Sequence, residues 1–106
     1  MDISVSELAD RMDEETAPIM IDVREPHEWE QQHLPGVQKI SLGTLPQKLD
    51  DIQEYKEQEV VMICRSGGRS GRATQYLQSQ GFSNVRNLTG GMLAWKAEID
   101  ETFDVD

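Results

Sequence analysis

Short apolar runs separated by amphipathic stretches set the pattern of this chain. The clearest run is 60–63, where four apolar residues follow one another and predict a strand buried on both faces. The run at 19–23 has a similar character, whereas the alternating polarity of 37–40 predicts a more exposed strand. Residues 85–88 and a short extended piece beginning at Ile3 complete a set of five expected strands.

The stretches between these strands predict helices. Ser4 and Glu7 have the spacing of a capping box, so a helix should follow and run to about Asp13. A proline near the start, or a glycine just past the end, marks several of the later helices. These helices are expected at 26–30, 45–52 and 70–80, and directly after the glycine pair 90–91.

Strands that alternate with helices at this spacing build βαβ units. The predicted fold is therefore α/β, with a mostly parallel five-stranded sheet and helices on both faces. Residues 1–106 fit a single domain, which ends in an acidic tail at about 100–106 that we expect to fray. In such sheets, ligands bind beyond the carboxyl ends of the strands. Cys64 and the segment 22–24 each follow a strand, so both should lie at this edge.

The distribution of charge limits the kinds of partner. The net charge is −10, which argues against a protein that binds nucleic acid or an anionic membrane surface. Residues 60–97 nevertheless contain five basic residues and no acidic one, so a basic segment surrounds Cys64 in an acidic protein. No apolar run is long enough to span a membrane, and the N-terminus lacks the features of a signal peptide.

Cys64 is the only cysteine in the chain. A single cysteine forms no internal disulfide and builds no cysteine-rich zinc site, so the expected compartment is a reducing cytoplasm. The sequence indicates no metal and no cofactor. A lone cysteine at a strand end is often a small buried core residue. That interpretation gives no role to the glycines, arginines and serines that follow Cys64.

The loop after Cys64 is suited to holding an anionic sulfur. Two glycines allow backbone amides to turn inward, two arginines add positive charge, and two serines add hydroxyl donors. The helix that follows would point its positive end at the sulfur. All these effects favour the thiolate, the reactive form of cysteine. We therefore expect Cys64 to be the nucleophile and the next six residues to form its binding loop: Arg65, Ser66, Gly67, Gly68, Arg69 and Ser70.

The position of Arg69 distinguishes two kinds of cysteine chemistry. Arg69 is the fifth residue after Cys64, whereas phosphatases of the Cys-x5-Arg type place their arginine one residue later. The shorter loop makes a smaller ring, which suits one extra sulfur on Cys64 better than a tetrahedral phosphate. A phosphate-binding NTPase loop fits less well, because the lysine of that motif is missing here.

Four motifs of this chain resemble those of a single-domain rhodanese, and they occur in the same order. Residues 64–70 resemble the active loop of that family, and residues 22–24 its Asp-Val-Arg turn. Residues 28–37 resemble its segment running from Glu-aromatic to His-Ile-Pro-Gly-Ala, and residues 90–95 its closing Gly-Gly…Ala-Trp helix. The resemblance covers nearly the whole chain and implies the rhodanese-like fold.

The resemblance also implies a sulfurtransferase mechanism. The Cys64 thiolate would attack the outer sulfur of a small anionic donor, thiosulfate or a persulfide, and become a persulfide itself. Cyanide or a thiol acceptor, on a small molecule or a protein, would then remove that sulfur in a double displacement. The loop amides would hold the outer sulfur, and Arg65 and Arg69 would attract the donor. Alternatively, Arg69 braces the loop through a carboxylate.

The remaining polar residues of these motifs are interpreted as structural. Asp22 and Arg24 are expected to pair and to support the loops. His33 lies in a Pro-Gly turn, so it and His27 are expected to be packing residues rather than partners in a Cys–His dyad. Two other functions stay open from the sequence: a sulfur carrier or interaction module that serves a partner protein, and a small phosphatase or arsenate reductase.

Overall fold

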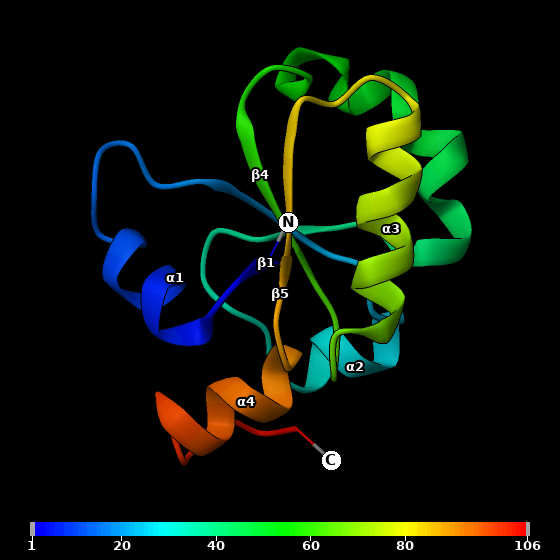
Figure 1. Ribbon diagram of the computed structural model, residues 1–106. Coiled ribbons are helices and arrows are strands. Elements are labelled where there is room, and N and C mark those ends of the chain that lie inside the picture. The colour runs from blue at the N-terminus through cyan, green and yellow to red at the C-terminus, as the bar shows by residue number, and fades with distance from the viewer. Residues whose placement is uncertain (1, 106) are drawn as a thin grey trace.

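The computed structural model describes residues 2–105 and contains one five-stranded sheet whose neighbouring strands are parallel (Figure 1). The strand order is β1-β5-β4-β2-β3, so β4 lies at the centre of the sheet. The predicted α/β class, with a parallel five-stranded sheet, is confirmed. The strands are β1 (Asp2–Ile3), β2 (Ile19–Asp22), β3 (Gln38–Lys39), β4 (Glu59–Ile63) and β5 (Asn84–Leu88).

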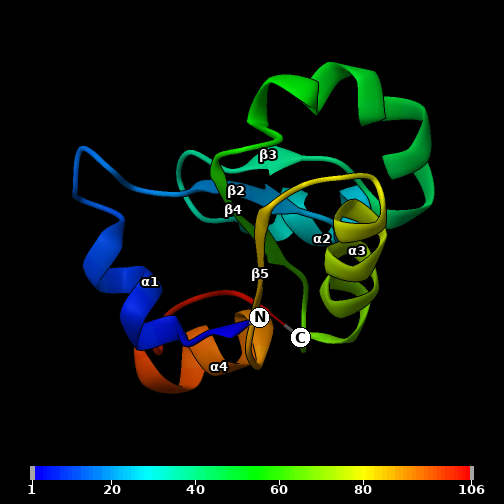
Figure 2. The same ribbon diagram turned by 45° about the horizontal axis from the view of Figure 1, so that its top comes forward.

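Helices cover both faces of this sheet (Figures 1 and 2). Helices α1 and α4 pack on one face, whereas α3 packs on the other together with a 3₁₀ segment, η1. None of the helices within residues 2–105 combines the length and the apolar character needed to cross a membrane. The helical elements are α1 (Val5–Arg11), α2 (Pro26–Gln31), η1 (Leu42–Tyr55), α3 (Gly68–Ser79) and α4 (Gly91–Glu98).

Strand β4 separates two hydrophobic cores, because successive side chains of a strand point to opposite faces. Val61 and Ile63 lie in the core under α1 and α4. Val60, Met62 and Cys64 lie in the core under α3 and η1. This alternation places the side chain of Cys64 on the α3 face of the sheet, where the first turn of α3 provides its hydrogen-bond donors.

The segment between β3 and β4 differs from the sequence prediction. Residues 42–55 form a 3₁₀ helix, whereas an α-helix was expected at 45–52. Leu45 and Ile52 are the buried residues of this segment, and Leu42, Leu49 and Tyr55 are partly buried against the same core. Pro46 removes a backbone donor near its start and disfavours a regular α-helical ladder. Helix α3 also begins earlier than predicted, at Gly68.

The C-terminal tail is docked, so the prediction that it frays is wrong for residues up to 105. Phe103 and Val105 are buried in the core under α1 and α4. The backbone amide of Asp104 donates to Oε1 of Gln32 at 2.7 Å, and Gln31 Nε2 donates to Oδ1 of Asp104 at 2.8 Å. The burial of Phe103 and Val105, together with the hydrogen bonds of Asp104, therefore holds this acidic segment against the end of α2.

Candidate active site

The sulfur of Cys64 lies in a ring of hydrogen-bond donors at the end of β4. The backbone amide of Gly67 donates to Sγ at 3.0 Å, and the hydroxyl of Ser70 donates to Sγ at 3.2 Å. Cys64 itself is only 1% exposed. The residue is thus buried as a core cysteine would be, but its sulfur is bound by polar groups that a core cysteine does not need.

These donors decide the protonation of the sulfur. Burial acts to raise the pKa of the Cys64 thiol, because it disfavours the charged thiolate. Hydrogen bonds from the Ser70 hydroxyl and from the backbone amides of Ser70, Gly67 and Ser66 outweigh that effect. The pKa of Cys64 therefore lies below the ordinary value of a thiol, which shifts its ionisation toward the thiolate.

The loop takes its shape from a left-handed residue at Gly67. Gly67 has φ +104°, a conformation that side chains other than glycine rarely adopt, and it caps the N-terminus of α3. The turn brings the first residues of α3 against the sulfur, so the positive end of that helix faces Cys64. Gly68 is the first residue of α3, and Ser66 is exposed and contributes through its backbone amide.

A second glycine pair holds the other side of the loop. The amides of Met92 and Leu93, at the start of α4, donate to the carbonyls of Cys64 and Arg65, both at 2.9 Å. This contact requires the backbones to approach closely, because a Cβ atom on Gly91 would lie 2.7 Å from the carbonyl oxygen of Arg65. The N-terminus of α4 therefore fixes the backbone carbonyls of Cys64 and Arg65, and these contacts do not involve the side chains of the two residues.

Arg69 binds a carboxylate on α2. Its Nη1 and Nη2 donate to Oε1 and Oε2 of Glu28 at 2.6 and 2.9 Å, which is the bidentate geometry of a strong ion pair. The hydrogen bonds from Arg69 lower the pKa of Glu28 to about 2, so the carboxylate stays charged. The geometry matches the alternative in which Arg69 braces the loop, and direct contact of Arg69 with a donor stays a prediction.

Asp22 and Arg24 are brought together at the end of β2. Arg24 Nε donates to Oδ1 of Asp22 at 3.0 Å, and Nη2 donates to Oδ2 at 2.8 Å. Both side chains are 1% exposed, so this ion pair is buried. Arg24 Nη2 also donates to the carbonyl of Gln32 at 2.7 Å and thereby ties the turn after β2 to the end of α2.

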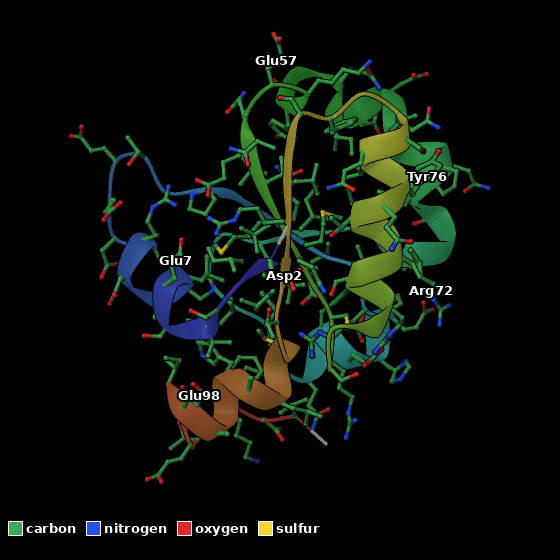
Figure 3. All side chains as sticks on the ribbon, viewed as in Figure 1. Asp2, Glu7, Glu57, Arg72, Tyr76 and Glu98 are labelled. Atoms are coloured by element: carbon green, nitrogen blue, oxygen red, sulfur yellow. The ribbon has the colours of Figure 1, made fainter. Side chains whose placement is uncertain are left out.

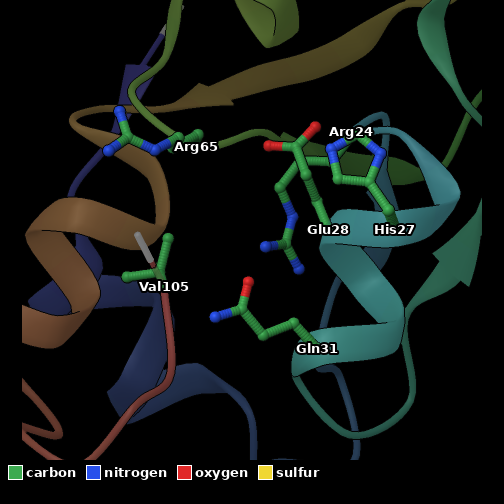
Figure 4. A pocket seen from close by; sticks show the side chains of 6 residues that line it. All are labelled: Arg24, His27, Glu28, Gln31, Arg65 and Val105. Atoms are coloured by element: carbon green, nitrogen blue, oxygen red, sulfur yellow. The ribbon is translucent and has the colours of Figure 1, made fainter.

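A polar pocket lies beside the loop, between α2 and the docked tail (Figure 4). Its volume is about 180 Å³. Of the predicted site residues, Arg24 and Arg65 line this pocket, whereas His27 and Gln31 were not predicted to belong to a site. His33 does not line the pocket, and its Nδ1 lies 2.8 Å from the carbonyl oxygen of Trp29. The pocket lining comprises Arg24, His27, Glu28, Gln31, Arg65 and Val105.

Comparison with known proteins assigns this arrangement to a family. The model of the Rhodanese-like domain family matches residues 4–98. The chain belongs to this family. YtwF of Bacillus subtilis is 38% identical over 97 residues, which cover 92% of this chain and 91% of that protein. A protein named thiosulfate sulfurtransferase GlpE, from Pseudoalteromonas translucida, is 28% identical over 102 residues, covering 96% and 94% of the two chains.

Solved structures agree with this assignment. A rhodanese-like domain protein from Staphylococcus aureus has a TM-score of 0.84 and 28% identity to this chain, and the match covers 100% of this chain and 99% of that one. The chain is thus a rhodanese-like domain, as its motifs indicated.

Two residues of this rhodanese-like domain contact the loop without having been predicted from the sequence. The sequence places Glu28 within a motif without assigning it a contact, and it predicts for Arg69 only that a carboxylate could bind it. Asn87 is predicted only as part of the strand at 85–88, yet its amide contacts both Ser70 and Gly67. The alternation of β5 carried the signal, because Asn87 shares a face with the buried Val85 and is therefore a polar residue at an inward position.

Proposed function

We propose that this rhodanese-like domain transfers a sulfane sulfur from thiosulfate or a persulfide donor to cyanide or a thiol acceptor through a Cys64 persulfide. The observation that carries this proposal is the ring of donors on Sγ, which favours a thiolate without any histidine base. A thiolate is the form that attacks sulfur, and the same donors suit the anionic persulfide that follows.

The reaction balances in two displacements. In the first, the Cys64 thiolate attacks the outer sulfur of thiosulfate, a new S–S bond forms, and the sulfur–sulfur bond of thiosulfate breaks. Sulfite leaves with the electron pair of that bond, and the negative charge of Cys64 moves to the outer sulfur. In the second, cyanide or a thiolate attacks the outer sulfur, and the Cys64 thiolate leaves.

The loop residues have distinct roles in this proposal. The amides of residues 65–70 hold the outer sulfur, with Gly67 and Gly68 allowing the turn and with Ser66 and Ser70 adding donors. Arg65 belongs to the loop and also lines the pocket, and it attracts the anionic donor. Arg69 acts through Glu28 as a brace for the loop, and the Asp22–Arg24 pair supports it from β2. A reducing compartment such as the cytoplasm would keep Cys64 available.

Steady-state formation of thiocyanate from thiosulfate and cyanide tests this proposal. We expect turnover by the unmodified chain and none by Cys64→Ser. Arg72→Gln is the control, because this arginine is exposed on the outer side of α3 and takes no part in the site (Figure 3). Hydrolysis of an aryl phosphate that depends on Cys64, with no thiocyanate formed, would overturn the proposal in favour of a phosphatase.

The identity of the acceptor has its own test. If Cys64 takes up sulfur but cyanide and small thiols do not remove it at a useful rate, while a protein thiol or thiocarboxylate does, the domain is a sulfur carrier for a partner. Turnover with small acceptors identifies the enzyme instead.

A further inference from the structure

A single side chain on β5 contacts two of the residues that donate to the Cys64 sulfur, Ser70 and Gly67. Asn87 lies opposite Met62 of β4 in the sheet register, two residues before Cys64 along the neighbouring strand. The Oδ1 atom of Asn87 accepts a short hydrogen bond from the hydroxyl of Ser70, and its Nδ2 donates to the carbonyl of Gly67 at 3.2 Å. Ser70 is completely buried, so no solvent replaces these contacts.

The contacts of Ser70 compete with each other. Its hydroxyl oxygen lies within hydrogen-bond distance of two acceptors, Sγ of Cys64 and Oδ1 of Asn87. A serine hydroxyl carries one proton and can make one strong donor bond at a time. The reversed orientation of the Asn87 amide would end this competition, but it is disfavoured because it would place Oδ1 against the carbonyl oxygen of Gly67.

We propose that Asn87 is a positioning residue that competes with the Cys64 thiolate for the proton of the Ser70 hydroxyl. The hydroxyl then turns between its two acceptors according to the charge on Sγ. Its use in a catalytic cycle rests on the sulfur-transfer function proposed above, but the competition itself is a property of the resting site.

The balance between the acceptors follows from their charge. A hydrogen bond to a thiolate is charge-assisted and stronger than one to a neutral amide, so the hydroxyl points at Sγ when Cys64 is ionised. When Cys64 is a protonated thiol, or when Sγ is bonded to a second sulfur that carries the charge, Sγ is a weak acceptor. The hydroxyl then donates to Asn87. No proton leaves Ser70 in either state, since only the O–H bond rotates.

This competition has a definite consequence for reactivity. Asn87 stabilises the thiol and the sulfur-loaded forms of Cys64, and it gives less support to the free thiolate. It therefore keeps the nucleophile less acidic than the donor ring alone would make it, and it favours the loaded state once sulfur has been accepted.

The structure offers a way to separate this role from simple support of the loop. The carbonyl of Gly67 also accepts a hydrogen bond from the amide of Gly71 at 3.0 Å, so it keeps a partner when the Asn87 amide is removed. The charged and titratable groups around the loop and the adjoining pocket are unchanged by substitutions at Asn87. They are Arg65 and Arg69 on the loop and α3, Glu28 and His27 on α2, and Asp22 and Arg24 at the end of β2.

The test is the pKa of Cys64, measured as the pH dependence of its alkylation by iodoacetamide and followed by intact mass. Cys64 is the only cysteine, so the modification reports on one site. We expect Asn87→Ala to lower this pKa by about half a unit, because the thiol form loses a hydrogen-bonded neighbour. We expect Asn87→Asp to raise it, because a carboxylate competes more strongly and repels the thiolate. Asn84→Ala, on the same strand, is the control without effect.

The decisive result is that the pKa of Cys64 shifts in opposite directions in Asn87→Ala and Asn87→Asp. Loss of loop support alone would weaken the donors to the thiolate in both variants and raise the pKa in both. A pKa that rises or stays constant in Asn87→Ala therefore overturns the proposal. If Asn87→Ala does not fold, Asn87→Leu replaces it, because leucine has a similar volume and no hydrogen-bonding group.

A second measurement tests the route through Ser70. Ser70→Ala alone should raise the pKa of Cys64, and adding Asn87→Ala to it should cause no further shift. A shift of the original size in the Ser70→Ala background would overturn the proposal. Because alkylation requires no sulfur donor, a failure of sulfur transfer leaves these results interpretable, and the two proposals can fail separately.

Discussion

Arg69 and Glu28 are 41 residues apart in the sequence, and their side chains are joined by two hydrogen bonds, of 2.6 and 2.9 Å. The pair links the first turn of α3 to α2, so it closes the loop around Cys64 from the outside. Its partial exposure means that water screens part of the attraction.

Glu28→Gln should lower the free energy of unfolding at neutral pH by about 1–2 kcal/mol, since it removes a bidentate, partly buried ion pair. Urea denaturation measures this change. The control is Glu30→Gln on the same helix, because Glu30 is exposed and its loss should change stability by less than about 0.5 kcal/mol.

The same pair predicts the pH dependence of stability. The folded-state pKa of Glu28 is about 2, below an ordinary value of 4.5, so folding favours the charged form. Its contribution is complete above pH 4.5 and is lost as the pH falls toward 2. Glu28→Gln should therefore show a smaller loss of stability over that interval than the unmodified chain. Equal losses in both proteins would contradict this assignment.

Gly91→Ala should destabilise the domain by about 2 kcal/mol or more. Gly91 has φ +57°, and an added Cβ would meet the carbonyl group of Arg65 at 2.7 Å. Neither partner can move freely, because both belong to backbone held by hydrogen bonds. Gly43→Ala is the matched control, since a Cβ at that position would meet no atom within 4 Å outside its own local backbone. Thermal unfolding of the two variants gives the comparison, and equal midpoints would contradict the close approach.

Arg24→Met should cost about 3–5 kcal/mol of stability, because it leaves the carboxylate of Asp22 buried and unpaired. The double variant Asp22→Asn with Arg24→Met removes both charges and should recover part of this loss. Denaturant unfolding of the two single variants and the double variant forms a cycle. Strictly additive losses would show that the two side chains do not act as a pair.

Arg65→Gln should reduce kcat/KM for thiosulfate by about ten-fold, because it removes a positive charge beside the loop. Most of the change should appear in KM, since attraction of the anionic donor precedes the chemical step. Arg72→Gln carries the same charge change on an exposed part of α3 and should leave both constants unchanged. A similar decrease in both variants would indicate a general effect of net charge instead of a local one.

Much of the site could be predicted from the sequence because its residues directly follow the apolar runs of two strands. Cys64 follows an uninterrupted apolar run, and Asp22 and Arg24 follow another. Because both strands are parallel and adjacent, their carboxyl ends meet at one edge. The glycines after Cys64 indicated the turn, and Gly67 adopts the left-handed conformation that only glycine reaches easily.

Other features depended on tertiary contacts that have no local pattern. The identity of Glu28 as the partner of Arg69 follows from how α2 docks, and nothing within either segment specifies it. The acidic residues of the tail predict fraying, although Phe103 and Val105 supply an apolar pattern that the packing uses. The 3₁₀ form of residues 42–55 reflects a competition between two hydrogen-bond registers, which differ too little for side-chain pattern to decide.

The central claim is that Cys64 accepts a sulfur atom, and the intact mass of the protein after incubation with thiosulfate tests it most directly. The account predicts a gain equal to one sulfur atom, its removal by cyanide, and no gain in Cys64→Ser. An unchanged mass, with a Cys64 thiol that remains fully open to alkylation after thiosulfate treatment, would contradict it.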